Sequence, residues 1–149
     1  MELKLEYDKN LYGVEHKAGP FEVTEELIKR YCIATGETNE IFIDSEEAKK
    51  VGYPGLVAPP TMCTMFVRHV KLPDIKLNFG KNRFHAGQRV TTRLPIIAGD
   101  FLSASSHLKE VYPKTGRSGT MVFIVWETTF TNQEGQIVAD VQESFATRE

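Results

Sequence analysis

A carboxylate and an amide stand two residues apart where a helical pattern ends and a loop begins. The segment 34–39 reads Ala-Thr-Gly-Glu-Thr-Asn, so Glu37 and Asn39 follow Gly36, a residue type that commonly ends helices. A carboxylate held in such a loop can take up or return a proton in a reaction. We therefore consider Glu37 a candidate acid/base group, with Asn39 orienting it. The structural alternative is that Glu37 is a solvated carboxylate beside the helix end and that Phe42 fills the core.

A second segment can stabilise developing negative charge. Residues 56–62 read Leu-Val-Ala-Pro-Pro-Thr-Met and lead into an apolar helical pattern. The first turn of a helix offers free N–H groups and a positive dipole end to an oxyanion. Pro59 and Pro60 carry no N–H, so two of these donors are missing. Thr61 or Met62 must then supply the donor that polarises a bound carbonyl.

Both segments resemble those of the MaoC-like dehydratases and R-specific enoyl-CoA hydratases. In that family the first segment runs small residue, Ser or Thr, Gly, Asp, any residue, Asn, Pro, apolar residue, His. Gly36 and Asn39 match it, Glu37 replaces the Asp, and Phe42 replaces the His. The resemblance implies that the family Asp and His act on one water in the reversible hydration of a trans-2-enoyl thioester. Glu37 retains acid/base chemistry, whereas Phe42 cannot transfer a proton.

A third segment narrows the resemblance to the N-terminal MaoC-like subgroup, which includes fungal and mycobacterial fatty-acid dehydratase components. The Ala-Pro-Pro-Thr of 58–61 is typical of that subgroup, as are Phe-His-Ala-Gly-Gln over 84–88 and Leu-Pro-Ile-Ile-Ala-Gly-Asp over 94–100. Together the three segments cover roughly 30–102. Because Phe42 removes the family's base, His85 is the candidate substitute. The alternative is that His85, a lone His at a strand start, is structural.

The resemblance implies a hot-dog fold that holds an acyl thioester, carried by coenzyme A or by an acyl carrier protein, with no metal or other cofactor. The candidate substrate-binding residues are Gly36, Phe42, Thr61 and Met62. Basic residues can also meet the phosphates of either carrier, although most of them are equally typical of solvated strand positions. These are Lys76, Lys81, Arg83, Arg89 and Arg93.

Three functions stay open on these residues. The first is a 3-hydroxyacyl-thioester dehydratase or enoyl-thioester hydratase that uses Glu37. The second is an inactive hot-dog subunit that shapes the acyl pocket for a MaoC-like partner whose Asp and His are intact; Phe42 and the two prolines favour it. The third is a thioesterase on the same fold, which also needs a carboxylate near the central helix.

The elements that must position these residues divide into a helical first half and a strand-rich second half, which predicts an α+β fold in one domain over 1–149. Caps and breakers predict helices that begin after Thr24, at Asp44 and at Pro59. An extended arm over 1–22 precedes them, with turns predicted at Tyr12-Gly13 and at Gly19-Pro20. The third helix is apolar almost all round, so we expect an antiparallel sheet to curl around it. Strands are predicted over 88–94, 100–111, 120–131 and 136–147.

Such a sheet leaves a long edge strand, which predicts a homodimer or a heterodimer with another MaoC-like chain.

A net charge of -2 gives no electrostatic basis for binding nucleic acid or an anionic membrane. The beginning of the chain lacks the apolar run of a signal peptide and no long apolar segment follows, so we expect a cytoplasmic protein. Cys32 and Cys63 lie in apolar helical patterns, which predicts buried thiols.

Overall fold

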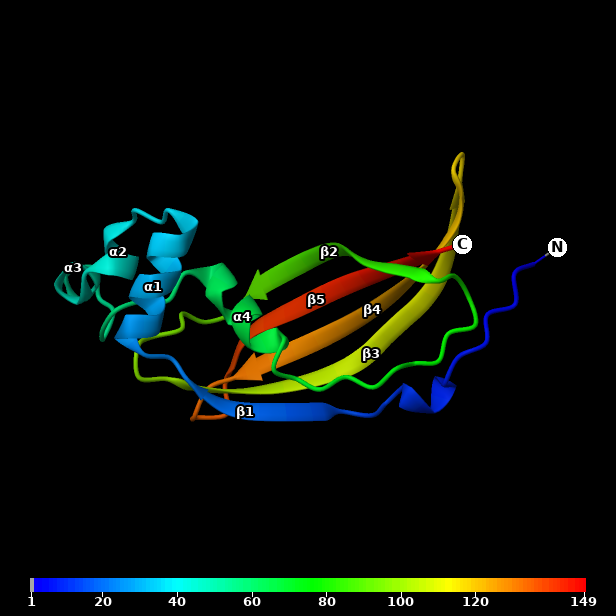
Figure 1. The fold of residues 1–149 in the computed structure, drawn as a ribbon. Helices are drawn as coiled ribbons and strands as arrows, with labels where there is room; N and C mark the ends of the chain where they lie inside the picture. Colours follow the sequence, from blue (N-terminus) through cyan, green and yellow to red (C-terminus); the bar gives the residue numbers. More distant parts are fainter. Residues whose placement is uncertain (1) are drawn as a thin grey trace.

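The sheet consists of five antiparallel strands in the computed structural model, which describes residues 2–149 (Figure 1). The order across the sheet is β1-β3-β4-β5-β2, so β1 and β2 are its edges. The four predicted strands are confirmed, although β2 begins six residues earlier than predicted. The strands are β1 (His16–Glu22), β2 (Asn82–Thr92), β3 (Phe101–Gly116), β4 (Gly119–Thr131) and β5 (Ile137–Arg148).

The first edge strand corrects the prediction of an extended arm over 1–22. Its residues pair with β3 from His16 opposite Ser106 onward, and the register shifts between Ala18 and Phe21. Gly19 lies at this irregularity with a φ of 100°, and a Cβ there would stand 2.7 Å from the carbonyl oxygen of Leu102. The Gly-Pro pair that looked like a turn is therefore an interruption within a strand.

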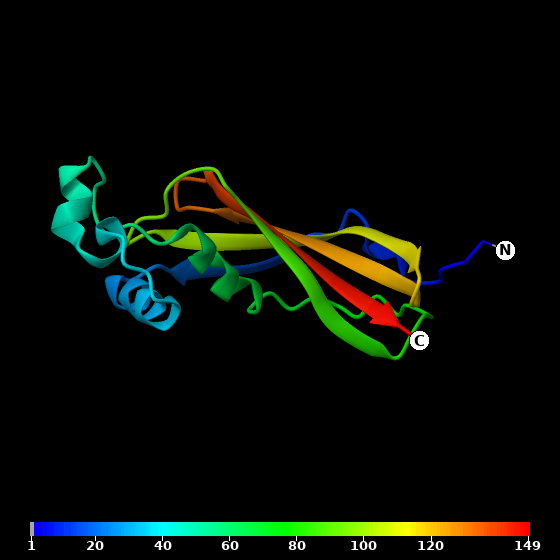
Figure 2. The ribbon, with the colours of Figure 1, turned by 90° about the horizontal axis from the view of Figure 1, so that it is seen from above.

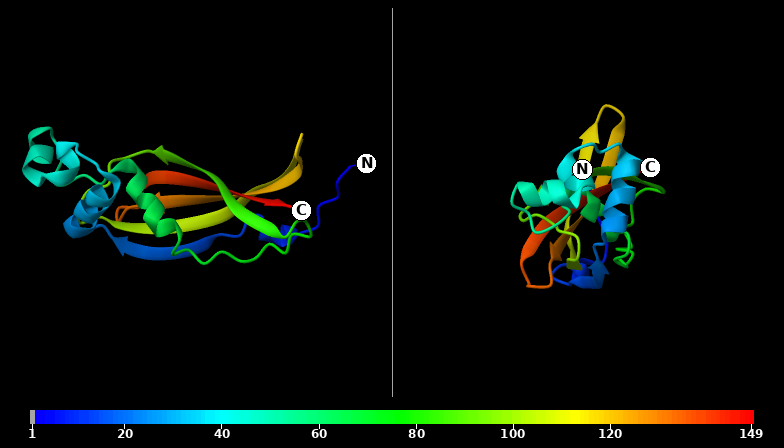
Figure 3. Two further views of the ribbon diagram at one scale, coloured as in Figure 1. Left: turned by 45° about the horizontal axis from the view of Figure 1, so that its top comes forward. Right: turned by 90° about the vertical axis from the view of Figure 1, so that its left-hand side faces the viewer.

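Three helices gather at one end of the sheet (Figures 1 and 3). They are α1 (Glu25–Thr35), α2 (Glu40–Ile43) and α3 (Ser45–Lys50). Both predicted starts are confirmed: Thr24 caps α1, and the Asp44 carboxylate accepts hydrogen bonds from the N–H groups of Glu46 and Glu47. Helix α2 was not predicted. Gly36 ends α1 in the left-handed conformation with a φ of 73°, which glycine adopts without strain.

The predicted central helix is shorter than expected. It consists of a 3₁₀ turn, η2 (Pro60–Cys63), and a single α-helical turn, α4 (Thr64–Val67). Two turn hydrogen bonds follow, from the N–H of His69 to the Phe66 carbonyl and from the N–H of Val70 to the Val67 carbonyl. It packs against one face of the sheet, as Figure 2 shows from above, and we call this the inner face. The tight opening follows from Pro59 and Pro60, which cannot donate the hydrogen bonds of a regular first turn.

The core fills the space between this short helix and the sheet. Met62, Cys63 and Phe66 are buried there together with inward-facing strand residues such as Leu102 and Phe130. A second cluster lies farther along the sheet and contains Ile75, Leu108, Ile124 and Trp126. Trp126 is thus a core residue within one chain.

The cap of α1 gives a first prediction. Thr24 Oγ1 accepts a hydrogen bond of 3.1 Å from the N–H of Leu27, so Thr24→Ala should lower the free energy of unfolding by about 1 kcal/mol. Urea denaturation measures this loss. Thr35→Ala is the control because the exposed Thr35 hydroxyl only donates back to the Tyr31 carbonyl. An equal loss in both variants would contradict a specific capping role.

Candidate functional site

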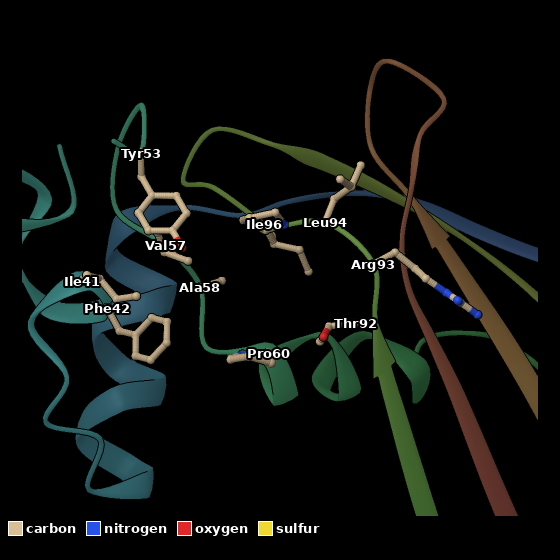
Figure 4. Close-up of a pocket in the computed structure, with 11 residues that line it drawn as sticks. Ile41, Phe42, Tyr53, Val57, Ala58, Pro60, Thr92, Arg93, Leu94 and Ile96 are labelled. Carbon is tan, nitrogen blue, oxygen red and sulfur yellow. The ribbon is translucent and has the colours of Figure 1, made fainter. Parts of the chain in front are cut away.

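An open pocket of about 240 Å³ lies where the helical end meets the sheet. Figure 4 shows Phe42, Ala58, Pro60 and Ile96 around a common space, whereas the Arg93 side chain extends away from it. We call this space the Phe42 pocket. Its other lining residues are Ile41, Tyr53, Val57, Thr92, Leu94 and Pro95. The lining is mainly apolar and carries no carboxylate, so the pocket suits a hydrocarbon group.

Backbone hydrogen bonds fix the loop that forms one wall of the Phe42 pocket. The Val57 N–H donates to the Ile41 carbonyl at 3.1 Å, and the Ala58 N–H donates to the Ile96 carbonyl at 2.8 Å. The loop is therefore hydrogen-bonded to α2 on one side and to the segment after β2 on the other. These two bonds hold Phe42 opposite the entry of the central helix.

Glu37 and Asn39 lie together at the start of α2, beside the Phe42 pocket in sequence but not in its lining. Glu37 Oε1 accepts hydrogen bonds from the backbone N–H groups of Thr38 and Asn39, both at 3.0 Å. The Asn39 side chain instead caps α2 by accepting from the Ile41 N–H at 3.2 Å. Asn39 thus orients the carboxylate through its backbone and not through its amide. The Asn-Glu pair at 39–40 is a helix-start signal that could have revealed α2.

The entry of the central helix retains one candidate N–H donor. The Met62 N–H donates to the Pro59 carbonyl at 2.9 Å, and the Met62 side chain is buried in the core. Thr61 is therefore the first residue whose N–H can face a ligand. Its exposed hydroxyl also shares a hydrogen bond of 2.7 Å with the Tyr31 hydroxyl, which links the helix entry to α1.

His85 lies far from the Phe42 pocket within one chain. Thr92 of β2 lines that pocket, and His85 precedes Thr92 by seven residues on the same strand, a separation of roughly 20 Å. His85 Nε2 instead contacts Glu143 Oε2 on β5 at 3.0 Å, and its ring stands edge-on to Phe145. A single chain therefore does not bring His85 to the Phe42 pocket.

Both cysteines are buried, as predicted. Burial raises the pKa of the Cys63 thiol to about 11, so this thiol is protonated at neutral pH. Burial, and then the negative charge of Glu37, raise the pKa of Cys32. Neither thiol therefore serves as a thiolate nucleophile. Among residues 2–149, no three His, Cys, Asp or Glu side chains converge on a metal position, and no helix is long and apolar enough to cross a bilayer.

Sequence comparison assigns the chain to a family of known proteins. The family described as FAS1-like, dehydratase domain region, matches residues 10–141. A UPF0336 protein of Parafrankia is 34% identical over 125 residues, which cover 81% of this chain and 80% of that protein.

Two solved structures place the fold among the hot-dog proteins. One is a C-terminally truncated HadBC (3R-hydroxyacyl-ACP dehydratase) complex from Mycobacterium tuberculosis, with a TM-score of 0.78, 24% identity, and coverage of 93% of this chain and 98% of that one. The other is an (R)-hydratase from A. caviae involved in PHA biosynthesis, with a TM-score of 0.70, 13% identity, and coverage of 93% and 96%. The predicted α+β hot-dog fold is confirmed, and the chain belongs to the family of FAS1-like dehydratase-region proteins, a MaoC-like branch of that fold.

Proposed function

We propose that this chain is the acyl-binding subunit of a hydratase or dehydratase acting on trans-2-enoyl or 3-hydroxyacyl thioesters. In this proposal a related MaoC-like chain, with its Asp and His intact, performs the proton transfers. The observation that carries the proposal is the position of Phe42, whose ring lines an apolar pocket. The sequence resemblance aligns this residue with the family's His. A phenyl ring adds apolar contact for an acyl group and cannot exchange a proton with water.

The remaining groups of the site fit acyl binding. Each methylene buried against Phe42, Ala58 and Pro60 contributes about 0.8 kcal/mol to binding. Thr61 is not in the pocket lining but directly follows Pro60, which is; in this proposal its N–H at the helix entry holds the thioester carbonyl. Coenzyme A and an acyl carrier protein present the same thioester, so both suit this pocket.

The unpaired edge of β2 favours association with a second chain. β2 has eleven residues and pairs only with β5, whereas the other edge, β1, is shorter and is interrupted near Gly19. β2 also has a register irregularity, between His85 and Gly87, but it is the longer of the two edges, and a long free edge is the natural place for another sheet to pair. The HadBC structure is likewise a complex, which supports a heterodimer with a related chain over a solitary subunit.

Catalysis by Glu37 itself is the second candidate function. Only Oε1 of its carboxylate accepts hydrogen bonds from residues 2–149, so Oε2 is available to a water or to a substrate. A carboxylate fixed by two N–H groups with one oxygen available can act as a general base. This observation keeps a complete hydratase, active without a partner, as the alternative.

Glu37→Gln separates the two candidates. The substitution keeps an oxygen that can accept the N–H groups of Thr38 and Asn39 but removes the base. In the complex with a MaoC-like partner we expect the rate of crotonyl-CoA hydration to stay unchanged, as followed by the loss of enoyl-thioester absorbance. A fall of about 100-fold or more would instead assign the proton transfer to Glu37.

A further inference from the structure

A polar cluster lies on the inner face of the sheet, the face that the central helix covers, away from the Phe42 pocket. Glu143 of β5 accepts two hydrogen bonds at the same oxygen, Oε2: one from His85 at 3.0 Å and one from Gln88 at 3.3 Å. The Glu143 side chain is only 18% exposed, whereas His85 is 46% exposed. We call these three residues the Glu143 cluster. Its carboxylate is largely enclosed, and its two partners stand on the free edge strand.

The surroundings of the Glu143 cluster make it more than a surface ion pair. It borders an open pocket of about 450 Å³ that is also lined by Val67, Val70, Leu72 and Phe145. A carboxylate against apolar walls loses hydration, and this loss must be offset by hydrogen bonds. Both protein hydrogen bonds reach Oε2, and Oε1 accepts none from residues 2–149. Oε1 therefore presents a strong acceptor to whatever enters the pocket.

The two pockets lie along one seam between the central helix and β2. Pro60 and Thr92 line the Phe42 pocket, whereas Thr64 and Gln88 line the pocket of the Glu143 cluster. Gln88 and Thr92 are four residues apart on the strand, which corresponds to about 13 Å. Thr61 and Arg68, at the two ends of the helix, are about 10 Å apart. A ligand whose carbonyl is held at Thr61 can thus reach the Glu143 cluster with a group about 10 to 13 Å away.

We propose that the Glu143 cluster is a recognition subsite for an uncharged hydrogen-bonding group, an amide or a hydroxyl, of the thioester held at Thr61. This proposal rests on the proposed function. An amide N–H or a hydroxyl donates to Glu143 Oε1, and an amide carbonyl accepts from the second N–H of the Gln88 amide group. Arg68, which is exposed and lines the same pocket, gives its outer rim a positive charge.

Two parts of a thioester ligand carry such a group at this distance. The second amide of a pantetheine arm lies about eight bonds, or about 10 Å, from the thioester carbonyl. A hydroxyl far along a long acyl chain reaches the same distance in the other direction. The pantetheine arm offers both a donor and an acceptor, and it leaves the apolar Phe42 pocket to the acyl group, so it fits the Glu143 cluster better.

Calorimetric titration of the purified chain, together with its partner where one co-purifies, tests the proposal. One pair of ligands is butyryl-pantetheine and S-ethyl thiobutyrate; the other is the S-ethyl thioesters of ω-hydroxydecanoate and decanoate. Glu143→Ala is expected to weaken butyryl-pantetheine binding about tenfold and to leave the three S-ethyl thioesters unchanged. A loss confined to the ω-hydroxydecanoyl ester would place a distal acyl hydroxyl at the subsite.

Asp140→Ala is the matched control. Asp140 lies on the same strand, three residues away and hence on the opposite face, is also 18% exposed, and also makes an ion pair, with Arg93 at 3.0 Å. Gln88→Ala, which truncates an exposed side chain, provides a second test if Glu143→Ala does not fold, and should also weaken butyryl-pantetheine binding.

Two results would overturn the proposal. One is an equal weakening in Asp140→Ala; the other is unchanged affinity for every ligand in both cluster variants. If the wild-type chain binds thioesters and the cluster variants bind them equally well, only the subsite fails. If the wild-type chain binds none of the four ligands, the proposed acyl-binding function fails as well.

Discussion

The isolated chain is expected to hydrate crotonyl-CoA no faster than buffer, and a MaoC-like partner with the Asp and His intact should raise the rate by about 10²- to 10⁴-fold, the usual contribution of a positioned acid/base group. The physical reason is Phe42, which cannot exchange a proton, so that Glu37 has no histidine beside it to complete an acid/base pair. Enoyl-thioester absorbance measures the rate for each chain alone and for the mixture.

The partner's own catalytic pair provides the control for this reconstitution. Replacing its Asp by Asn should abolish turnover of the mixture while assembly, followed by size-exclusion chromatography, is retained. Rapid hydration by the isolated chain that disappears in Glu37→Gln would contradict the subunit proposal. It would show that Glu37 supports catalysis without the His that Phe42 replaces.

Local signals were sufficient to predict the elements that have them. Thr24 and Gly36 bound α1 because capping and the left-handed conformation depend on a few neighbouring atoms. Alternating apolar residues likewise predicted β3, β4 and β5. The same kind of reasoning failed for β1, because Gly19-Pro20 reads as a turn while pairing with β3, about 85 residues away, decides the outcome.

In the candidate site, too, local features could be predicted from the sequence, whereas contacts between distant residues could not. The sequence placed Glu37 and Asn39 at a helix end, but the capping of α2 by the Asn39 side chain depends on a short helix without a periodic pattern. His85 was singled out without its partner, because Glu143 lies 58 residues later and meets it only through the pairing of β2 with β5. Met62 was predicted to bind substrate, and its side chain faces the core because the helix entry is tightened by Pro59 and Pro60.

Phe130→Ala should produce the largest loss of stability, about 3 to 5 kcal/mol in the free energy of unfolding. Phe130 is fully buried, and its neighbours across the sheet are Ala104 on β3 and Ala139 on β5. The ring of Phe130 fills the space between two small alanine side chains. Removing it leaves a cavity, because the fixed spacing between strands prevents them from moving together to close it. Urea denaturation of the isolated chain measures the loss.

Phe84→Ala is the matched control, since it removes the same atoms from a side chain that is 42% exposed on the edge strand, and it should cost less than about 1 kcal/mol. Similar losses in both variants would mean that the core does not close around Phe130. Because Phe130 belongs to the same cluster as Met62 and Phe66, its removal also loosens the central helix from the sheet. Thioester affinity should therefore fall in Phe130→Ala even below its unfolding midpoint, whereas Phe84→Ala should leave it unchanged.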